Sequence, residues 1–245
     1  MPEKQEKPVM HPVHWGDKPY HSLDYELRQT FGEKVYRLSL NGGMTCPNRD
    51  GTVNTGGCIF CSAGGSGDFA ACPSLSVTVQ IEQAKSRIRQ KTACKKFIAY
   101  FQAYTNTYAP VDYLRSLFTE AIRHPDIAAL SIATRCDCLP ADVLDLLEEL
   151  NRIKPVWIEL GLQSIHDTTL DAIHSGFHYT QYLDAVHALS DRNIPVITHL
   201  ILGLPGESQE MMLASVRQVA SLPVSGIKLQ LLHVLKGTEL GSLYA

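Results

Sequence analysis

Three cysteines lie close together in the first quarter of the chain, where Cys46, Cys58 and Cys61 form the spacing C-x11-C-x2-C. The residues between them are rich in glycine, asparagine and threonine, which indicates a loop rather than a helix or strand. Thiolates gathered on a loop can bind a metal ion or an iron–sulfur cluster. A structural zinc ion requires four ligands, and no further cysteine or histidine lies within a few residues of Cys61. A [4Fe–4S] cluster held by three cysteines would leave one iron free to bind a reactant.

A regular alternation of strands and helices must position this loop. From residue 35 onward, short runs rich in β-branched and aromatic residues alternate with segments that carry apolar residues at helical spacing. Six such steps without a long polar linker indicate one α/β domain with a parallel sheet, either doubly wound or an open (β/α)6 barrel. A short helix over 22–31 precedes them. We predict strands at about 35–40, 96–103, 127–134, 155–162, 194–202 and 226–232, and helices near 77–91, 112–124, 140–151, 180–191 and 207–221.

The parity of polar residues within the strands favours the partial barrel. Glu159, Gly161 and Gln163 share one face of the fourth strand, because side chains alternate between the two faces. A packed barrel interior is apolar, so repeated polar or small residues on one face indicate a wide, ligand-filled lumen. The alternative is that these residues face solvent at the sheet edges. The other strands place Ser131, Ala133, Arg135, His199, Gly203, Lys228 and Gln230 in the same way.

Composition excludes several other classes of protein. Hydrophobic residues make up 44% of the 245 residues and charged residues 19%, which is typical of a globular protein. No apolar run approaches the roughly 20 residues that span a bilayer, and the polar start lacks the apolar segment of a signal peptide, so we expect a cytoplasmic protein. The seven cysteines are odd in number, which favours ligands and free thiols over a disulfide framework. The net charge of −3 gives no overall basic footprint for nucleic acid.

The cysteine loop resembles that of radical S-adenosylmethionine (SAM) enzymes, in which an aromatic residue such as Phe60 precedes the last cysteine. Their commonest spacing is C-x3-C-x2-C, so the long first gap is a departure. The motifs CPNRDG and GGCIFC at the two ends of the loop look like those of a subfamily related to the Elongator-type and coproporphyrinogen-dehydrogenase-type enzymes. Three later motifs follow in order at strand ends, namely TRCD at 134–137, ELGLQS at 159–164 and GLPGE at 203–207.

The resemblance implies a fold, a cofactor pair and a chemistry. The fold would be a partial (β/α)6 TIM-like barrel, with residues 1–33 as an N-terminal extension and 34–245 as the radical SAM core. Cys46, Cys58 and Cys61 would bind a [4Fe–4S] cluster whose free iron holds SAM. Reductive cleavage of SAM would give a 5'-deoxyadenosyl radical that modifies a substrate, with electrons from a flavodoxin- or ferredoxin-like donor. The difficult chemistry then belongs to the cofactor, and the protein positions it.

Residues at the strand ends are candidates for contacts with SAM. Many relatives carry an arginine before a glycine after the fourth strand, and Ser175 occupies that position here, so the anchor of the SAM carboxylate stays open between Arg135 and Lys228. The alternative for Glu159 is a core carboxylate paired with Arg135, because a buried carboxylate needs a partner. The candidates for SAM binding are Gln102, Arg135, Glu159, Gln163, Leu202 and Gly203.

The substrate suggested by the resemblance is transfer RNA, with a carboxymethyl-type group on the wobble uridine as the target. Tyr104, Tyr108, Arg49 and Lys95 could stack on or neutralise an RNA strand, although such residues are common on ordinary surfaces. One alternative is radical oxidation of a small molecule such as a tetrapyrrole. Another is a zinc-binding module without catalysis.

Overall fold

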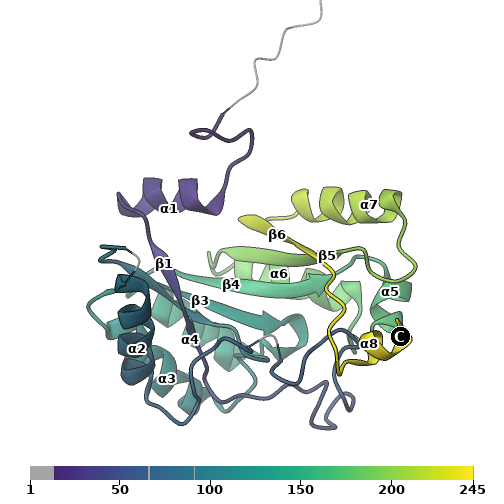
Figure 1. The fold of residues 1–245 in the computed structure, drawn as a ribbon, viewed down its shortest axis with the longest axis horizontal. Helices are drawn as coiled ribbons and strands as arrows, with labels where there is room; N and C mark the ends of the chain where they lie inside the picture. The colour runs from purple at the N-terminus through teal and green to yellow at the C-terminus, as the bar shows by residue number, and fades with distance from the viewer. Residues whose placement is uncertain (1–13, 66, 91, 245) are drawn as a thin grey trace, which may run out of the picture.

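The computed structural model describes residues 14–65, 67–90 and 92–244. It has an N-terminal helix followed by six β/α steps (Figure 1). The strands are β1 (Tyr36–Leu40), β2 (Phe97–Phe101), β3 (Ile127–Arg135), β4 (Val156–Gln163), β5 (Val196–Leu202) and β6 (Gly226–Leu231). The helices are α1 (Leu23–Phe31), α2 (Val77–Arg89), α3 (Val111–Arg123), the 3-10 turn η1 (Cys136–Cys138), α4 (Ala141–Asn151), α5 (Asp167–Ala172), α6 (Tyr179–Ser190), α7 (Gln209–Ala220) and α8 (Glu239–Leu243).

All six strands are parallel, and each pairs with the next in the order β1-β2-β3-β4-β5-β6. A doubly wound sheet would reverse its strand order at a switch point. The sequential order therefore excludes that alternative and confirms the partial barrel, a half-barrel with helices on its outer face (Figure 1). Strands β1 and β6 form its two open edges.

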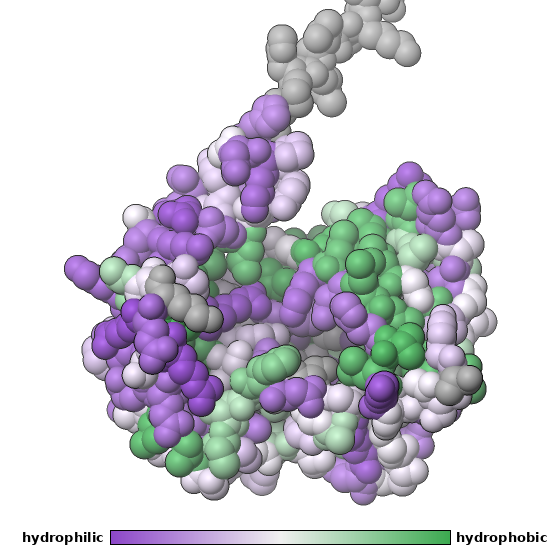
Figure 2. Space-filling view, in the orientation of Figure 1, coloured by the Kyte–Doolittle hydropathy of each residue, from purple (hydrophilic) through white to green (hydrophobic). Residues whose placement is uncertain are grey.

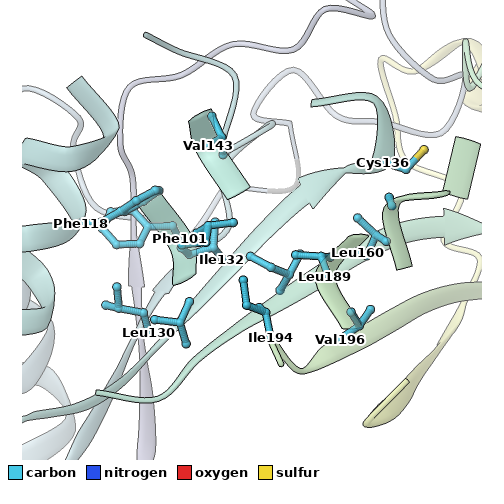
Figure 3. Close-up of a cluster of buried hydrophobic side chains, with 14 of the residues drawn as sticks. Phe101, Phe118, Leu130, Ile132, Cys136, Val143, Leu160, Leu189, Ile194 and Val196 are labelled. Carbon is cyan, nitrogen blue, oxygen red and sulfur yellow. The ribbon is translucent and has the colours of Figure 1, made fainter. Parts of the chain in front are cut away.

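The main core lies between the outer face of the sheet and the helices. Helix α3 buries Leu114, Phe118, Ala121 and Ile122, which recur at the helical spacing that predicted it. Alternate strand residues meet them, because parallel strands covered by helices present an apolar face to those helices. Phe101 and Phe118 pack edge to face with their ring centroids 5.1 Å apart. The same core contains Leu130, Ile132, Leu160, Leu189, Ile194 and Val196 (Figure 3).

A second, smaller core closes the N-terminal end of the lumen. Leu27 of α1 packs with residues at the N-terminal ends of the first four strands. These are Val35, Ile98, Ala129 and Trp157. Ser22 caps the N-terminus of α1, where its side chain accepts a hydrogen bond from the amide of Tyr25. Gly32 caps the C-terminus in the left-handed conformation (φ 74°). The floor of the lumen is therefore apolar, and the polar residues of the strands lie above it.

The predicted elements match the structure closely, with three omissions. The 3-10 turn η1 and the helices α5 and α8 were not predicted, because elements of three to six residues are too short to show a period. Within the described residues, none of the helices has the length and apolar character needed to cross a membrane.

Candidate functional site

A cavity of about 420 Å³ opens at the carboxyl ends of the strands, on the concave side of the half-barrel. Its apolar wall includes Leu231 and Leu235 and continues into the hydrophobic surface over β6 and the segment after it (Figure 2). Polar strand residues and the cysteine loop form the remaining walls. The cavity brings together most of the residues selected from the sequence, namely Cys46, Cys58, Cys61, Gln102, Arg135, Glu159 and Gln163.

The long gap between the first two cysteines folds into a small hairpin. Asp50 and Thr55 form an antiparallel bridge, and the amide of Gly57 donates to the carbonyl of Asn48 over 2.8 Å. This hairpin returns the chain to the starting point of the loop, so that Cys58 lines the same cavity as Cys46. The extra residues therefore change the length of the loop without removing a thiol from the site.

Asn48 and Gly176 fix this hairpin against the barrel. The side-chain amide of Asn48 is fully buried and donates to the carbonyl of His174 over 2.6 Å and toward the Sγ atom of Cys58 over 3.4 Å. A Cβ at Gly176 would lie 2.6 Å from Val53 and 2.8 Å from Asn48, and the φ of 73° also favours glycine there. The cysteine loop can therefore pack against this turn only because Gly176 has no side chain.

The arrangement of the thiols fits a cluster better than a single zinc ion. Zinc bound at about 2.3 Å to each sulfur would hold the sulfur atoms about 3.8 Å apart. In the part of the chain that the structure describes, the Sγ atoms of Cys46, Cys58 and Cys61 do not all lie within 4.8 Å of one another. A [4Fe–4S] cluster binds each thiolate through a separate iron, which requires this wider spacing. Burial, and to a smaller extent the neighbouring Cys61, raises the pKa of Cys58 to about 12. A bound cation is therefore needed to keep Cys58 in its thiolate form.

Arg135 lies at the end of β3, next to the thiols. Its Nε and Nη2 donate to the two oxygens of Asp137 over 2.9 and 2.7 Å, and its Nη1 donates to the carbonyl of Ser175 over 2.8 Å. Its guanidinium also lies 5.0 Å from the ring centroid of Phe177. These contacts fix the side chain, which lines the cavity, and use one N–H of each terminal nitrogen, so that the second N–H of each stays available. Ser175 itself bonds locally to Phe177 over 2.9 Å.

Glu159 lies in the middle of the lumen and is 1% exposed. Its Oε1 accepts from Ser131 over 2.7 Å and pairs with Arg37 at 2.6 Å, while its Oε2 lies 2.7 Å from Nε2 of His199 and 3.8 Å from Nζ of Lys228. Burial would raise the pKa of this carboxyl, but the bond from His199 and the charge of Arg37 outweigh burial and lower the pKa to about 2. The carboxylate is thus ionised, with two donors on Oε1 and one on Oε2. Its partner is Arg37, so the alternative of a core carboxylate paired with Arg135 is wrong, because Arg135 pairs with Asp137.

The remaining two candidates, Leu202 and Gly203, lie outside the cavity lining. Side chains alternate along β5, so His199 and Ile201 face the lumen whereas Leu202 points to the other face. Ile201 is therefore the residue of β5 that a ligand in the cavity would contact near the strand end. Gln163 lines the cavity, as the alternation along β4 predicts, although the register shifts between Gly161 and Gln163 and Gln163 has a left-handed φ of 75°.

The sequence reasoning missed two residues of the lumen, Arg37 and Tyr100. Arg37 alternates with apolar residues in β1, which is the signal that revealed Glu159 and Lys228, whereas Tyr100 lies in the uniformly apolar strand β2, which gives no such signal. The guanidinium of Arg37 lies 4.9 Å from the ring centroid of Tyr100, and the ammonium of Lys228 lies 5.9 Å from it. Together with the Glu159 contacts, these residues form a charged layer above the apolar floor.

Comparison with known proteins gives a consistent result. The family model described as "Radical SAM superfamily" matches residues 46–219. The uncharacterized protein YtqA of Bacillus subtilis is 48% identical over 228 residues, which are 93% of this chain and 71% of that protein. A tRNA uridine(34) acetyltransferase of Methanocaldococcus infernus is 30% identical over 125 residues, which are 49% of this chain and 22% of that protein.

Solved structures with a similar fold include two proteins of the groups named above. The archaeal Elp3 of Methanocaldococcus infernus has a TM-score of 0.62 at 18% identity, and the alignment covers 86% of this chain and 48% of that one. Coproporphyrinogen III oxidase (HemN) of Escherichia coli has a TM-score of 0.54 at 15% identity, with 83% and 45% covered. The chain thus spans about half the length of these two proteins or less. At these identities the likeness concerns the fold alone.

Proposed function

The chain belongs to the radical SAM superfamily, and from this premise we propose that it removes a hydrogen atom from a carboxymethyl-type group on the wobble uridine of tRNA. The cofactors of this superfamily are a [4Fe–4S] cluster and SAM. The observation that carries the proposal is the meeting of the three thiols with polar strand residues in one cavity at the carboxyl ends of the strands. In barrels of this type, ligands and chemistry belong to that end.

Cys46, Cys58 and Cys61 would hold the cluster, and of the predicted SAM contacts Gln102, Gln163 and Arg135 would offer polar groups to SAM. When bound, this cofactor pair would use an electron from the external donor to supply the carbon radical that takes a hydrogen atom from the substrate. The protein places the two reactants in one cavity and keeps water away from them. Asn48 and Gly176 act indirectly, because they hold the cysteine loop against the barrel.

Two observations support RNA as the substrate. The first is likeness to tRNA-modifying proteins, since a relative named tRNA uridine(34) acetyltransferase matches half of this chain and Elp3 has a similar fold with a TM-score of 0.62. At the cavity, Arg49 lies 5.6 Å from the ring centroid of Tyr104, and both residues line the opening. A cation stacked on an aromatic ring suits an unpaired base and its phosphate. Tyr108 lies nearby, with its hydroxyl 2.8 Å from that of Thr52.

The test compares wobble nucleosides in tRNA from a strain with the gene and a strain without it. The deletion strain should accumulate the carboxymethyl-type uridine and lack the nucleoside derived from it. A gene copy encoding the intact protein should restore the profile, whereas a Cys58→Ala copy should not. An unchanged nucleoside profile in the deletion strain would exclude this substrate.

An electron must come from outside the chain, and a flavodoxin- or ferredoxin-like protein is the donor we propose. Purified protein with a reconstituted cluster should produce 5'-deoxyadenosine from SAM with such a donor and tRNA from the deletion strain. Dithionite serves as the control reductant. If the product forms with dithionite but not with the flavodoxin- or ferredoxin-like protein, the physiological donor is a different one.

A further inference from the structure

Lys228 carries a charge in the lumen whose ion-pair partner, Glu159, is already paired with Arg37 at shorter distance. Its side chain is 38% exposed and lines the cavity, and its Nζ atom lies 3.8 Å from Oε2 of Glu159, beyond hydrogen-bond distance. Within the described residues Nζ donates no hydrogen bond of ordinary geometry. The ammonium therefore keeps its donors for a ligand.

The charges of this layer do not cancel. Glu159 supplies one negative charge, which Arg37 already matches at 2.6 Å, and His199 occupies the second oxygen at 2.7 Å. Arg135, at the end of the neighbouring strand, has its own partner in Asp137. Lys228 thus leaves a surplus of one positive charge, and burial accordingly lowers its pKa. Because the side chain is 38% exposed, water compensates its charge only in part, and a bound counterion would complete that compensation.

Depth separates this charge from the cysteine loop. Lys228 lies three residues before the end of β6, which places it about 10 Å below the strand end at about 3.3 Å per residue. Arg135 ends β3 and lies next to the thiols, whereas Lys228 pairs in register with His199, in the middle of β5. A group bound at Lys228 would therefore lie below the space next to the cluster loop.

We propose that Lys228 binds a carboxylate on the reacting arm of the substrate. This inference rests on the proposed function, because it takes the lumen as the substrate site. A monoanion matches the surplus of one charge, whereas a phosphate dianion would exceed it. The ring of Tyr100 and the amide of Gln230, which also line the cavity, border the space around the ammonium. The same site would reject a neutral amide or ester, which leaves the charge unmatched.

SAM also carries a carboxylate, so the test must separate the two sources. Protein labelled with ¹³C,¹⁵N-lysine and loaded with its oxidised cluster is titrated while the Cε–Nζ resonance of Lys228 is followed. Lys228→Met assigns the resonance by its loss, and Lys96→Met, on the surface beside Glu33, is the control that keeps it. The probes are SAM, then acetate, 5-carboxymethyluridine and its neutral analogue 5-carbamoylmethyluridine, each added to SAM-saturated protein.

The expected result is a saturable shift of the Lys228 resonance with acetate and with 5-carboxymethyluridine, but not with the amide. Calorimetry should show that 5-carboxymethyluridine binds at least about tenfold more tightly than the amide, that Lys228→Met abolishes this preference, and that Lys228→Arg keeps part of it. A shift caused by SAM alone would assign the site to SAM and overturn the proposal. The absence of any shift with either carboxylate would overturn it as well.

The two proposals can fail separately. If acetate shifts the resonance while the uridine does not bind, the carboxylate site stands and the wobble uridine is the wrong substrate. If the uridine and its amide bind equally without moving the resonance, the substrate stands and the role of Lys228 is wrong.

Discussion

The imidazole of His199 and the carboxylate of Glu159 meet 2.7 Å apart across the neighbouring strands β4 and β5, in the middle of the lumen. Burial and this contact have opposite effects on the histidine, and burial prevails, so the pKa of His199 is lowered. The carboxylate is held ionised by the same contact and by Arg37. The charged layer thus has a fixed anion at its centre, around which its cations are arranged.

Glu159→Gln should destabilise the protein in a pH-dependent way. The folded pKa of about 2 lies below the ordinary value of 4.5, so the carboxylate contributes stability that is fully present above pH 4.5 and is lost as the pH falls toward 2. We expect the variant to lose on the order of a few kcal/mol at pH 6, with the difference from the parent shrinking below pH 4.5. Urea unfolding of both proteins from pH 3 to 7 measures it.

The control for this variant is Glu149→Gln, which removes an exposed carboxylate paired with Arg115 at 2.6 Å. A surface pair contributes less than about 1 kcal/mol, so this change should have little effect. A stability difference for Glu159→Gln that stays constant from pH 3 to 7 would contradict the assigned role of the charge.

Cys58→Ala should abolish cluster binding, whereas Cys72→Ala should not. Cys58 lines the cavity with the other two cysteines, and Cys72 is exposed outside the cavity lining. Anaerobically reconstituted protein should contain about four irons per chain, with a broad brown absorbance that the Cys58 variant lacks. Zinc as the bound metal in the parent, or full iron content in Cys58→Ala, would show that the loop does not hold a [4Fe–4S] cluster.

Gly176→Ala should loosen the cysteine loop, and Gly206→Ala provides a matched control. Both glycines have a positive φ, 73° and 83°, so alanine costs about 1 kcal/mol of strain at either position. Only at Gly176 does the new Cβ lie within 3 Å of other atoms, those of Val53 and Asn48, whereas Gly206 has open space. Iron content after reconstitution should fall for Gly176→Ala alone. Equal losses in both variants would mean that backbone strain, and not contact with the loop, causes the effect.

Much of the fold could be read from the sequence because the signals are local. The period of apolar residues located all six strands, and their parity placed Glu159, His199 and Lys228 in the lumen. The partner of Glu159 could not be read in this way, because it depends on the stagger between strands. Arg37 reaches the carboxylate across the concave face from β1, three strands away.

Details of the strand ends and loops could also not be predicted from the sequence. The register shift between Gly161 and Gln163 and the left-handed φ of Gln163 distort the end of β4, and no residue type there signals them. The hairpin of Asp50 and Thr55, which closes the long gap of the cysteine loop, depends on turns that the composition of the loop does not specify. The motif order predicted the site, and tertiary contacts decided which atoms face it.

Gln163→Gly should separate stability from cofactor binding. Gln163 has a φ of 75°, a conformation that costs a residue with a side chain about 1 kcal/mol and costs glycine little. Such strain at a cavity is typical of residues held in place for function. Replacement by glycine should leave the free energy of unfolding unchanged or raise it by up to about 1 kcal/mol.

If the amide of Gln163 binds SAM, the same change should weaken SAM binding about tenfold, as expected for a lost hydrogen bond to a charged ligand. Calorimetry with SAM and urea unfolding of the same preparations measure both effects. Asn193→Gly, at a surface position with a φ of 54°, is the control that should relieve strain without altering SAM affinity. A Gln163→Gly protein that binds SAM as tightly as the parent would remove Gln163 from the SAM site and leave its strain to be explained by packing alone.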